Sequence, residues 1–396
     1  MPTRLRLVLW SILSLLLGFA LLGRAAGESG PAPGAFPAKL SGWGLIHREG
    51  AMLKARAGSV TYDLATPLFS DYALKWRVLF LPKGAKVAYD PDRTFDLPVG
   101  TVIAKTFYYP LAPAAQSGGD TVLKARPADY QTGTSGLRLG RVRLMETRLL
   151  VRRDAGWVAL PYVWDEDQRD ATLERVGDTI ALTLVDGAER TPFTYVVPGT
   201  NDCAACHAPD YTKGAINRIE PIGLKARHLN RSFPGAFGEE NQLARLAKLG
   251  YLTGLPEART IPANVDWRDS AVPLDARARS YLDINCSHCH SPVGAARTTG
   301  LWFDQGHEHG ADWTSPTRIG ICKQIVAGGH GGGGRPFDVA PGEPDRSILL
   351  YRVGSSEPGT MMPEIGRSLV HAEGLALLTN WITRMDGRCR LASETP

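Results

Sequence analysis

Two copies of a five-residue pattern, C-x-x-C-H, constrain this chain more than any other feature of its sequence. One copy occupies residues 203–207 and the other residues 286–290, and together they use four of the six cysteines. Two thiols at this spacing can each form a thioether with one vinyl group of a haem, and the following histidine then ligates the iron. The sequence therefore predicts two covalently bound haem c groups.

The predicted haem-binding residues are the two cysteines and the histidine of each motif. They are Cys203, Cys206, Cys286 and Cys289 for attachment, with His207 and His290 as iron ligands. A zinc site is the alternative use of such cysteine and histidine clusters. The histidine that directly follows each cysteine pair favours haem over zinc.

Residues 1–27 have the pattern of a secretory signal peptide. Arg4 and Arg6 precede an apolar run at residues 7–22, and small residues follow at 25–27. The run is shorter than the roughly 20 residues of a membrane span, but an uncleaved signal would leave an N-terminal membrane anchor. Because covalent haems are attached outside the bacterial cytoplasm, we expect a periplasmic protein.

The two cysteines outside the motifs, Cys322 and Cys389, are expected to form a disulfide in such a compartment. Two unrelated buried thiols are the alternative. The formal charge is +5, and three of these charges (Arg4, Arg6 and Arg24) lie in the predicted signal. Nothing in this balance indicates a nucleic-acid partner.

The predicted fold class is α+β, in consecutive parts that follow a linker at residues 28–39. Short apolar or alternating runs predict a mostly antiparallel, β-sandwich-like domain over residues 40–198. The predicted strands are residues 75–81, 101–109, 141–152, 156–164, 178–185 and 193–197. Residues 199–262, with a helix near 240–249, are predicted to be a small helical extension that binds the first haem.

Residues 263–396 are predicted to be an all-α cytochrome c domain that holds the second haem. Residues 273–285 and 368–385 have helical spacing of apolar side chains, and the first of these runs leads into the second motif. A cytochrome c domain has this plan, with its two helices crossing. Met362, directly before Pro363, is the predicted second iron ligand of this haem, with Met361 as the alternative.

The second iron ligand of the first haem is left open by the sequence. The candidates are His228, Met145, Met52 and His47, or an open five-coordinate iron. Basic side chains near His228 are candidates to pair with haem propionates. They are Lys225, Arg227 and Arg231.

Several segments resemble a family of bacterial exported two-haem c-type cytochromes, often encoded beside a parallel β-helix repeat protein. The similar segments are residues 66–71, 105–110, 146–150, 157–162, 229–231, 241–243 and 361–364. Residues 341–344 and 347–350 also resemble cytochrome c domains in general. The resemblance implies haem binding at both C-x-x-C-H motifs and implies no substrate.

These observations favour a protein that transfers single electrons between periplasmic or surface redox partners, among them the β-helix repeat protein. The first alternative is a two-haem oxidoreductase, for example peroxidase-like, in which the first haem iron is open. A second alternative is a binding protein whose β domain recognises a ligand or partner. The sequence does not identify the acid and base groups that a catalyst would need.

Overall fold

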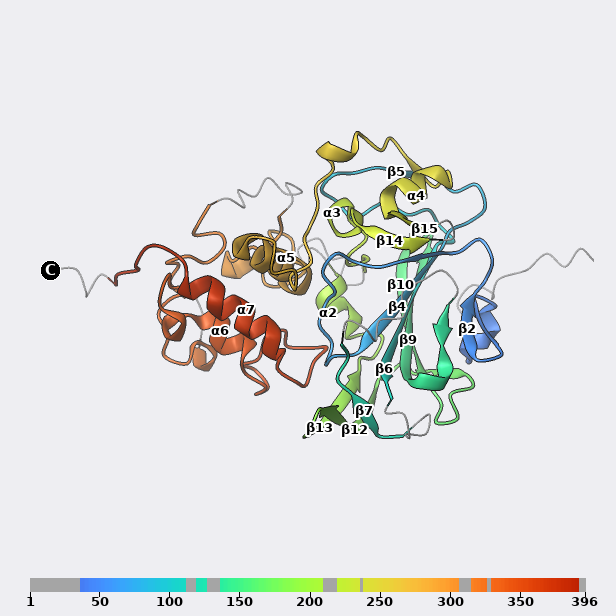
Figure 1. Ribbon diagram of the computed structural model, residues 1–396, viewed down its shortest axis with the longest axis horizontal. Coiled ribbons are helices and arrows are strands. Elements are labelled where there is room, and N and C mark those ends of the chain that lie inside the picture. Colours follow the sequence, from blue (N-terminus) through green and yellow to red (C-terminus); the bar gives the residue numbers. More distant parts are fainter. Residues whose placement is uncertain are drawn as a thin grey trace, which may run out of the picture. The chain divides into compact units, whose positions relative to one another are not determined.

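A six-stranded antiparallel sheet is the central element of the computed structural model (Figure 1). The structure describes residues 36–111, 119–126, 136–208, 219–235, 238–305, 315–325 and 329–391. The strand order is β11-β10-β9-β6-β4-β3, and every neighbouring pair is antiparallel. The strands are β3 (Val60–Tyr62), β4 (Leu74–Phe80), β6 (Val102–Pro110), β9 (Val142–Arg153), β10 (Gly156–Trp164) and β11 (Ala171–Leu173).

A second sheet has the order β13-β12-β7, in which β12 (Asp178–Asp186) and β13 (Glu189–Val197) form a hairpin and β7 (Thr121–Leu123) runs parallel to β12. In β13 the side chains of Phe193, Tyr195 and Val197 are buried and their neighbours are more exposed. This alternation is typical of a strand with one face against a core. By contrast, β4 and β6 are buried along almost their whole length.

Side chains of strand β6 belong to two separate hydrophobic clusters. Ile103 packs in a cluster with α3 (Ala226–Leu229), α4 (Gln242–Lys248) and β16 (Leu252–Thr253). Phe107 and Tyr109 pack in another cluster, against the β12–β13 hairpin. Lys105 lies between Ile103 and Phe107 on the same strand, so a cation separates the two apolar regions.

Several further short elements lie in the described residues before position 261. They are η1 (Leu40–Trp43), β1 (Ile46–Glu49), β2 (Met52–Ala55), β5 (Val87–Ala88), β8 (Leu137–Arg138), η3 (Leu139–Arg141), α2 (Cys203–His207), β14 (Ser232–Gly235), β15 (Gly238–Asn241) and η5 (Ala258–Thr260). Strands β1, β2 and β8 form a third sheet, β14 pairs with β15, and β16 pairs with β5.

Three helices, α5 (Leu274–Cys286), α6 (Ile348–Val353) and α7 (Ala372–Thr383), pack around a core that includes Leu282, Leu378 and Trp381 (Figure 1). A Cβ at Gly374 of α7 would collide with the Tyr281 hydroxyl of α5, so glycine permits this close approach. In the described parts of the connections between these helices lie the short 3₁₀ turns η6 (Arg297–Thr299), η7 (Gly329–Gly332) and η8 (Pro344–Arg346).

The predicted fold class is wrong at its C-terminal part. The chain is mostly β-sheet with few helices, with 30% strand and 21% helix, and no all-α cytochrome c domain is present. In the part of the chain that the structure describes, only α4, α5 and α7 have seven or more residues. Glycine and proline are frequent between residues 315 and 367 and disfavour long helices, and the described part of this stretch contains one short helix, α6, with 3₁₀ turns, loops and isolated β-bridges.

The individual strands and helices agree with the prediction better than the fold class does. All six runs predicted to be strands are strands, and the helices predicted near residues 240–249, 273–285 and 368–385 are α4, α5 and α7. The predicted disulfide between Cys322 and Cys389 is also present, with its Cα atoms 5.2 Å apart.

The signal peptide predicted at residues 1–27, and the membrane anchor that it would form if uncleaved, lie outside the described residues. Of the predicted linker at residues 28–39, only residues 36–39 are described. Within the described ranges, no helix is both long enough and apolar enough to cross a bilayer.

Candidate functional site

The first C-x-x-C-H motif forms α2, a single helical turn that begins six residues after the end of β13. The Sγ of Cys203 donates a hydrogen bond to the carbonyl oxygen of Gly199 at 3.4 Å. The Nδ1–H of His207 donates to the carbonyl oxygen of Glu220, with 2.7 Å between the heavy atoms. This bond fixes the orientation of the imidazole and leaves its Nε2 atom for a metal, as in most protein metal sites.

The second motif begins at the C-terminal residue of α5. The backbone N–H groups of Cys289 and His290 both donate to the Cys286 carbonyl, at 3.1 and 2.8 Å, and so turn the chain sharply after the helix. A Cβ at Gly294 would collide with the Cys289 carbonyl, which makes glycine necessary there. The ring of Phe303 lies edge-on to the His290 ring, with 5.8 Å between centroids.

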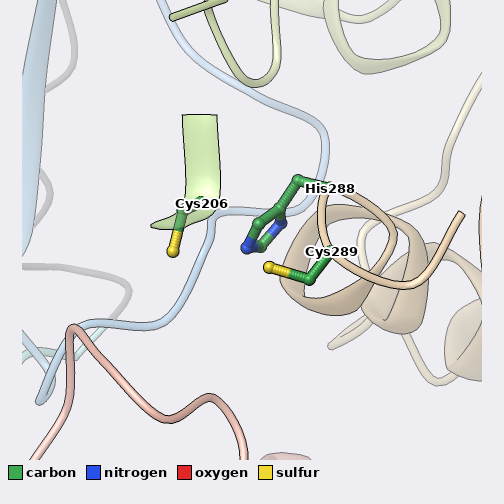
Figure 2. Close-up of side chains that lie close together, drawn as sticks. All are labelled: Cys206, His288 and Cys289. Atoms are coloured by element: carbon green, nitrogen blue, oxygen red, sulfur yellow. The ribbon is translucent and has the colours of Figure 1, made fainter. Parts of the chain in front are cut away.

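The fold brings the two motifs together at their second cysteines (Figure 2). Cys206 of α2 points toward His288 and Cys289, which lie in the turn after α5. One side-chain donor atom from each of these three residues lies within 4.8 Å of the others. The Sγ of Cys289 also donates to the carbonyl oxygen of Ala205 at 3.6 Å.

Burial keeps both motif histidines neutral. It lowers the pKa of His207 and the pKa of His290 to about 4. A neutral imidazole retains the lone pair that binds a metal. Burial also raises the pKa of the Cys286 thiol to about 12. The mutual interaction of the Cys206 and Cys289 side chains lowers the pKa of Cys206 and raises that of Cys289.

A cavity lies beside the first motif, with about 1320 Å³ of empty space that includes the open solvent at its mouth. Cys203, Cys206, His207 and His288 lie on its wall. Much of the rest is apolar, and includes Tyr62, Leu64, Leu68, Phe69, Ile103, Leu150, Ile222 and Ile284.

One wall of this cavity is the central sheet, and it carries three cations in register. Arg77 of β4 is the Cα partner of Lys105 of β6, which is in turn the partner of Arg148 of β9. All three line the cavity. Arg77 pairs with Asp63 at 2.5 Å, and Arg148 makes two bonds to Glu146, at 2.7 and 2.5 Å.

Sequence reasoning missed these cations, although a signal for them exists. Lys105 is the lone charge of the otherwise mostly apolar strand β6, whereas β4 contains a second cation and β9 contains several charges. Lysine and arginine are rarely buried in such positions without a partner or a ligand. What the sequence does not give is the strand register that places the three side by side.

Three candidates for the second iron ligand of the first haem are not brought to His207. Met145 is buried in the core against the β12–β13 hairpin, Met52 belongs to the separate sheet β1-β2-β8, and the side chain of His47 is 53% exposed on β1. None of them lines the cavity beside the first motif.

His228, the fourth candidate, is a buried structural residue. Only 2% of it is exposed, and burial lowers its pKa to about 4. Its Nδ1 atom lies 3.1 Å from the side-chain nitrogen of Asn264, and its Nε2 atom lies 3.6 Å from Asp283. These neighbours occupy both ring nitrogens, and His228 does not line the cavity.

The three cations that the sequence suggested for haem propionates are paired with carboxylates of the chain itself. Arg227 is buried and binds Asp304 at 2.7 Å, Lys225 lies 3.6 Å from the same carboxylate, and Arg231 lies 3.7 Å from Asp63. The structure thus gives them a role in joining segments of the fold.

Met362 lies in a loop, and both its backbone N–H and its carbonyl group form hydrogen bonds. Its N–H donates to the Arg352 carbonyl at 2.9 Å, and its carbonyl accepts from the Arg367 guanidinium at 2.9 Å. The following loop residues Pro363 and Ile365 line the cavity of the first motif. Iron ligation by Met362 or by Met361 stays a prediction.

Asp71 connects this loop to the sheet region. Its carboxylate accepts hydrogen bonds from the N–H groups of Ser368 and Leu369, the shortest at 2.7 Å. The Tyr109 hydroxyl donates to the Asp71 carbonyl at 2.6 Å. Burial, only partly offset by these amides and by the charge of Arg367, raises the pKa of Asp71 to about 6.

The residues fit covalent haem better than zinc. A structural zinc ion takes four ligands in a tetrahedron, whereas the described residues supply a group of three, Cys206, His288 and Cys289. Zinc at that point would leave one cysteine and the terminal histidine of each motif unused. Two haems would use all six.

Comparison with protein-family models, with curated proteins and with solved structures finds no match to this chain.

Proposed function

We propose that this chain is a c-type cytochrome that binds two haems covalently and transfers single electrons between redox partners. Cys203 and Cys206 would attach the first haem and Cys286 and Cys289 the second, with His207 and His290 as iron ligands. A haem so held supplies a one-electron iron couple at a potential set by its surroundings.

The observation that carries this proposal is the meeting of the two motifs. Cys206 of one motif and Cys289 of the other lie in one cluster whose donor atoms are within 4.8 Å (Figure 2). The two groups would therefore be attached at neighbouring points of the fold. Two redox centres attached so close together can exchange electrons within the molecule, which is what a carrier between partners requires.

Each motif has its own means of holding its histidine. The Glu220 carbonyl orients His207 at 2.7 Å, and Phe303 packs against His290. Burial keeps both imidazoles neutral, with pKa values near 4. The protein thus contributes preset ligands, while the predicted export signal would deliver the chain to a periplasmic location with redox partners, such as a β-helix repeat protein.

Covalent attachment is tested on the purified protein produced with a haem-attachment system. We expect a haem stain that survives denaturing electrophoresis, two haems per chain by pyridine haemochrome assay, and an intact mass higher than that of the polypeptide by two haems. A chain that carries zinc and no covalent haem would overturn the proposal.

A peroxidase-like oxidoreductase is the second candidate, and one observation favours it. The cavity beside His207 opens to solvent, and no methionine is among the described residues that line it. An iron with an open position there would bind carbon monoxide when reduced and would turn over peroxide. Two low-spin haems without carbon monoxide binding would exclude this candidate and leave electron transfer.

A further inference from the structure

Three neighbouring cations on the cavity wall repel one another, and this repulsion destabilises the fold unless an anion lies beside them. Arg77, Lys105 and Arg148 are Cα partners on three neighbouring strands, so their side chains share one face of the sheet. Like charges directly opposite each other destabilise a sheet. Asp63 and Glu146 form ion pairs with the two arginines. The central lysine has no such ion pair.

Lys105 has the poorest set of partners in the row. Among the described residues it has no hydrogen bond or ion pair: the ring of Phe107 lies beside it, with 5.1 Å between Nζ and the ring centroid, and Glu146 attracts it only from a longer distance. Burial and the positive charges of Arg148 and Arg77 lower its pKa to about 7. An anion beside Nζ would offset both effects, because it stabilises the ammonium form.

The other charged side chains on the cavity wall are already engaged. Lys75 donates to the Leu68 carbonyl at 2.7 Å, and Arg367 donates to several backbone carbonyls, including Ser355 at 2.7 Å. Asp202 accepts from the N–H of Gly199 at 2.9 Å. Lys105 is therefore the cation on this wall that is free to bind a ligand.

We propose that Lys105, flanked by Arg77 and Arg148, binds the propionate carboxylates of the haem attached through Cys203 and Cys206. This inference rests on the proposed function and adds the group that receives the charged edge of the first haem. A haem is a large apolar ring with two carboxylates on one edge. The cavity has the matching composition, with an apolar lining, the attachment residues and one cationic wall.

The test is a potentiometric titration of the holoprotein, followed optically, for wild type, Lys105→Met and Lys105→Arg. Loss of a positive charge beside a haem favours the ferric state, so we expect Lys105→Met to lower the midpoint potential of one of two redox waves. Lys105→Arg keeps the charge and should restore the wild-type value. The wave that is missing from a Cys203→Ala/Cys206→Ala variant identifies the first haem.

Lys54→Met is the matched control. Lys54 lies on β2, pairs with Glu49 at 2.6 Å and does not line the cavity, so the same change in charge there should leave both waves unmoved. Haem content is measured on every sample. Two haems with unmoved waves in Lys105→Met would overturn the inference alone, as would an equal shift in Lys54→Met. A wild-type chain without covalent haem would instead overturn the proposed function.

Discussion

The two C-x-x-C-H motifs share a five-residue pattern and lie in different surroundings. The first is an isolated turn, α2, that follows a strand and lies beside a large cavity with a cationic sheet wall. The second ends the 13-residue helix α5, whose apolar side packs against α6 and α7. The pattern predicts the same covalent chemistry in both places, while the surrounding fold differs in solvent access and charge.

This difference bears on redox behaviour. A haem potential depends on burial, on nearby charge and on hydrogen bonds to the ligands. The first motif has a hydrogen-bonded histidine and cations nearby, and the second has an aromatic ring against its histidine and a helical core. We therefore expect two distinct potentials, and three further experiments test how independent the two regions are.

The largest effect is expected when one motif is removed. Cys203→Ala/Cys206→Ala and Cys286→Ala/Cys289→Ala should each reduce the haem content from two groups to one, because each pair of thiols holds a separate haem. Pyridine haemochrome assay and intact mass measure the loss. If either variant loses both haems while it remains folded by circular dichroism, the two sites are not independent.

The next effect concerns the disulfide, which belongs to the second region only. Cys322 and Cys389 are 67 residues apart, and a crosslink of this length stabilises a protein by about 4 kcal/mol in the chain-entropy treatment. Cys322→Ala/Cys389→Ala should lower the free energy of unfolding in urea by about that amount.

Hydrogen exchange then shows where the lost stability resides. Amides of the segment that includes Phe337 and Ala340, which pack on Cys389, should exchange faster. Amides of β4 and β6 should keep their wild-type protection under native conditions. Equal acceleration in both regions would mean that they open as one cooperative unit.

The smallest effect is expected at Asp71, which joins the loop after Met362 to the sheet region. Its folded-state pKa of about 6 exceeds the ordinary 3.8. The stability from this group is therefore complete below about pH 3.8 and is lost as the pH rises through 6, by roughly 1–3 kcal/mol. In Asp71→Asn this contribution should be absent, so the unfolding free energies of the two proteins should diverge between pH 4 and 6.

Asp71→Ala provides the control for the hydrogen bonds. Asp71 has a positive φ of 49°, a conformation that asparagine tolerates better than alanine. An amide oxygen can also accept from Ser368 and Leu369, whereas alanine cannot. Asp71→Ala should therefore be less stable than Asp71→Asn at every pH. An unchanged pH profile in Asp71→Asn would show that the carboxylate does not titrate in this range.

The sequence predicts elements here more reliably than their assembly. Alternation in β13 and helical spacing in α5 and α7 are local patterns, and all three elements occur where they are predicted. The predicted all-α C-terminal domain fails because two helices and a motif do not determine what a long glycine-rich connection does between them. Likewise, nothing local places Cys206 beside Cys289, or Arg77 beside Lys105.

For the candidate site, too, the sequence predicts the local motifs but not which distant residues lie beside them. Covalent chemistry at both motifs follows from spacing along the chain, and it remains a prediction that the experiments above address. His228 was a candidate because it is the histidine nearest to the first motif in the following segment, yet Asn264 and Asp283 hold it elsewhere. Proximity in sequence is a weak guide to ligation when the ligand comes from another segment.

The contact between Cys206 and Cys289 has a consequence for biosynthesis. In the oxidising compartment that the predicted signal peptide implies, two neighbouring thiols would readily form a disulfide, and one across this junction would consume a proposed attachment point of each motif. A chain that reached its final fold before modification would therefore risk a dead-end crosslink. We expect that the cofactors are loaded while the two segments are still apart, so that maturation precedes folding.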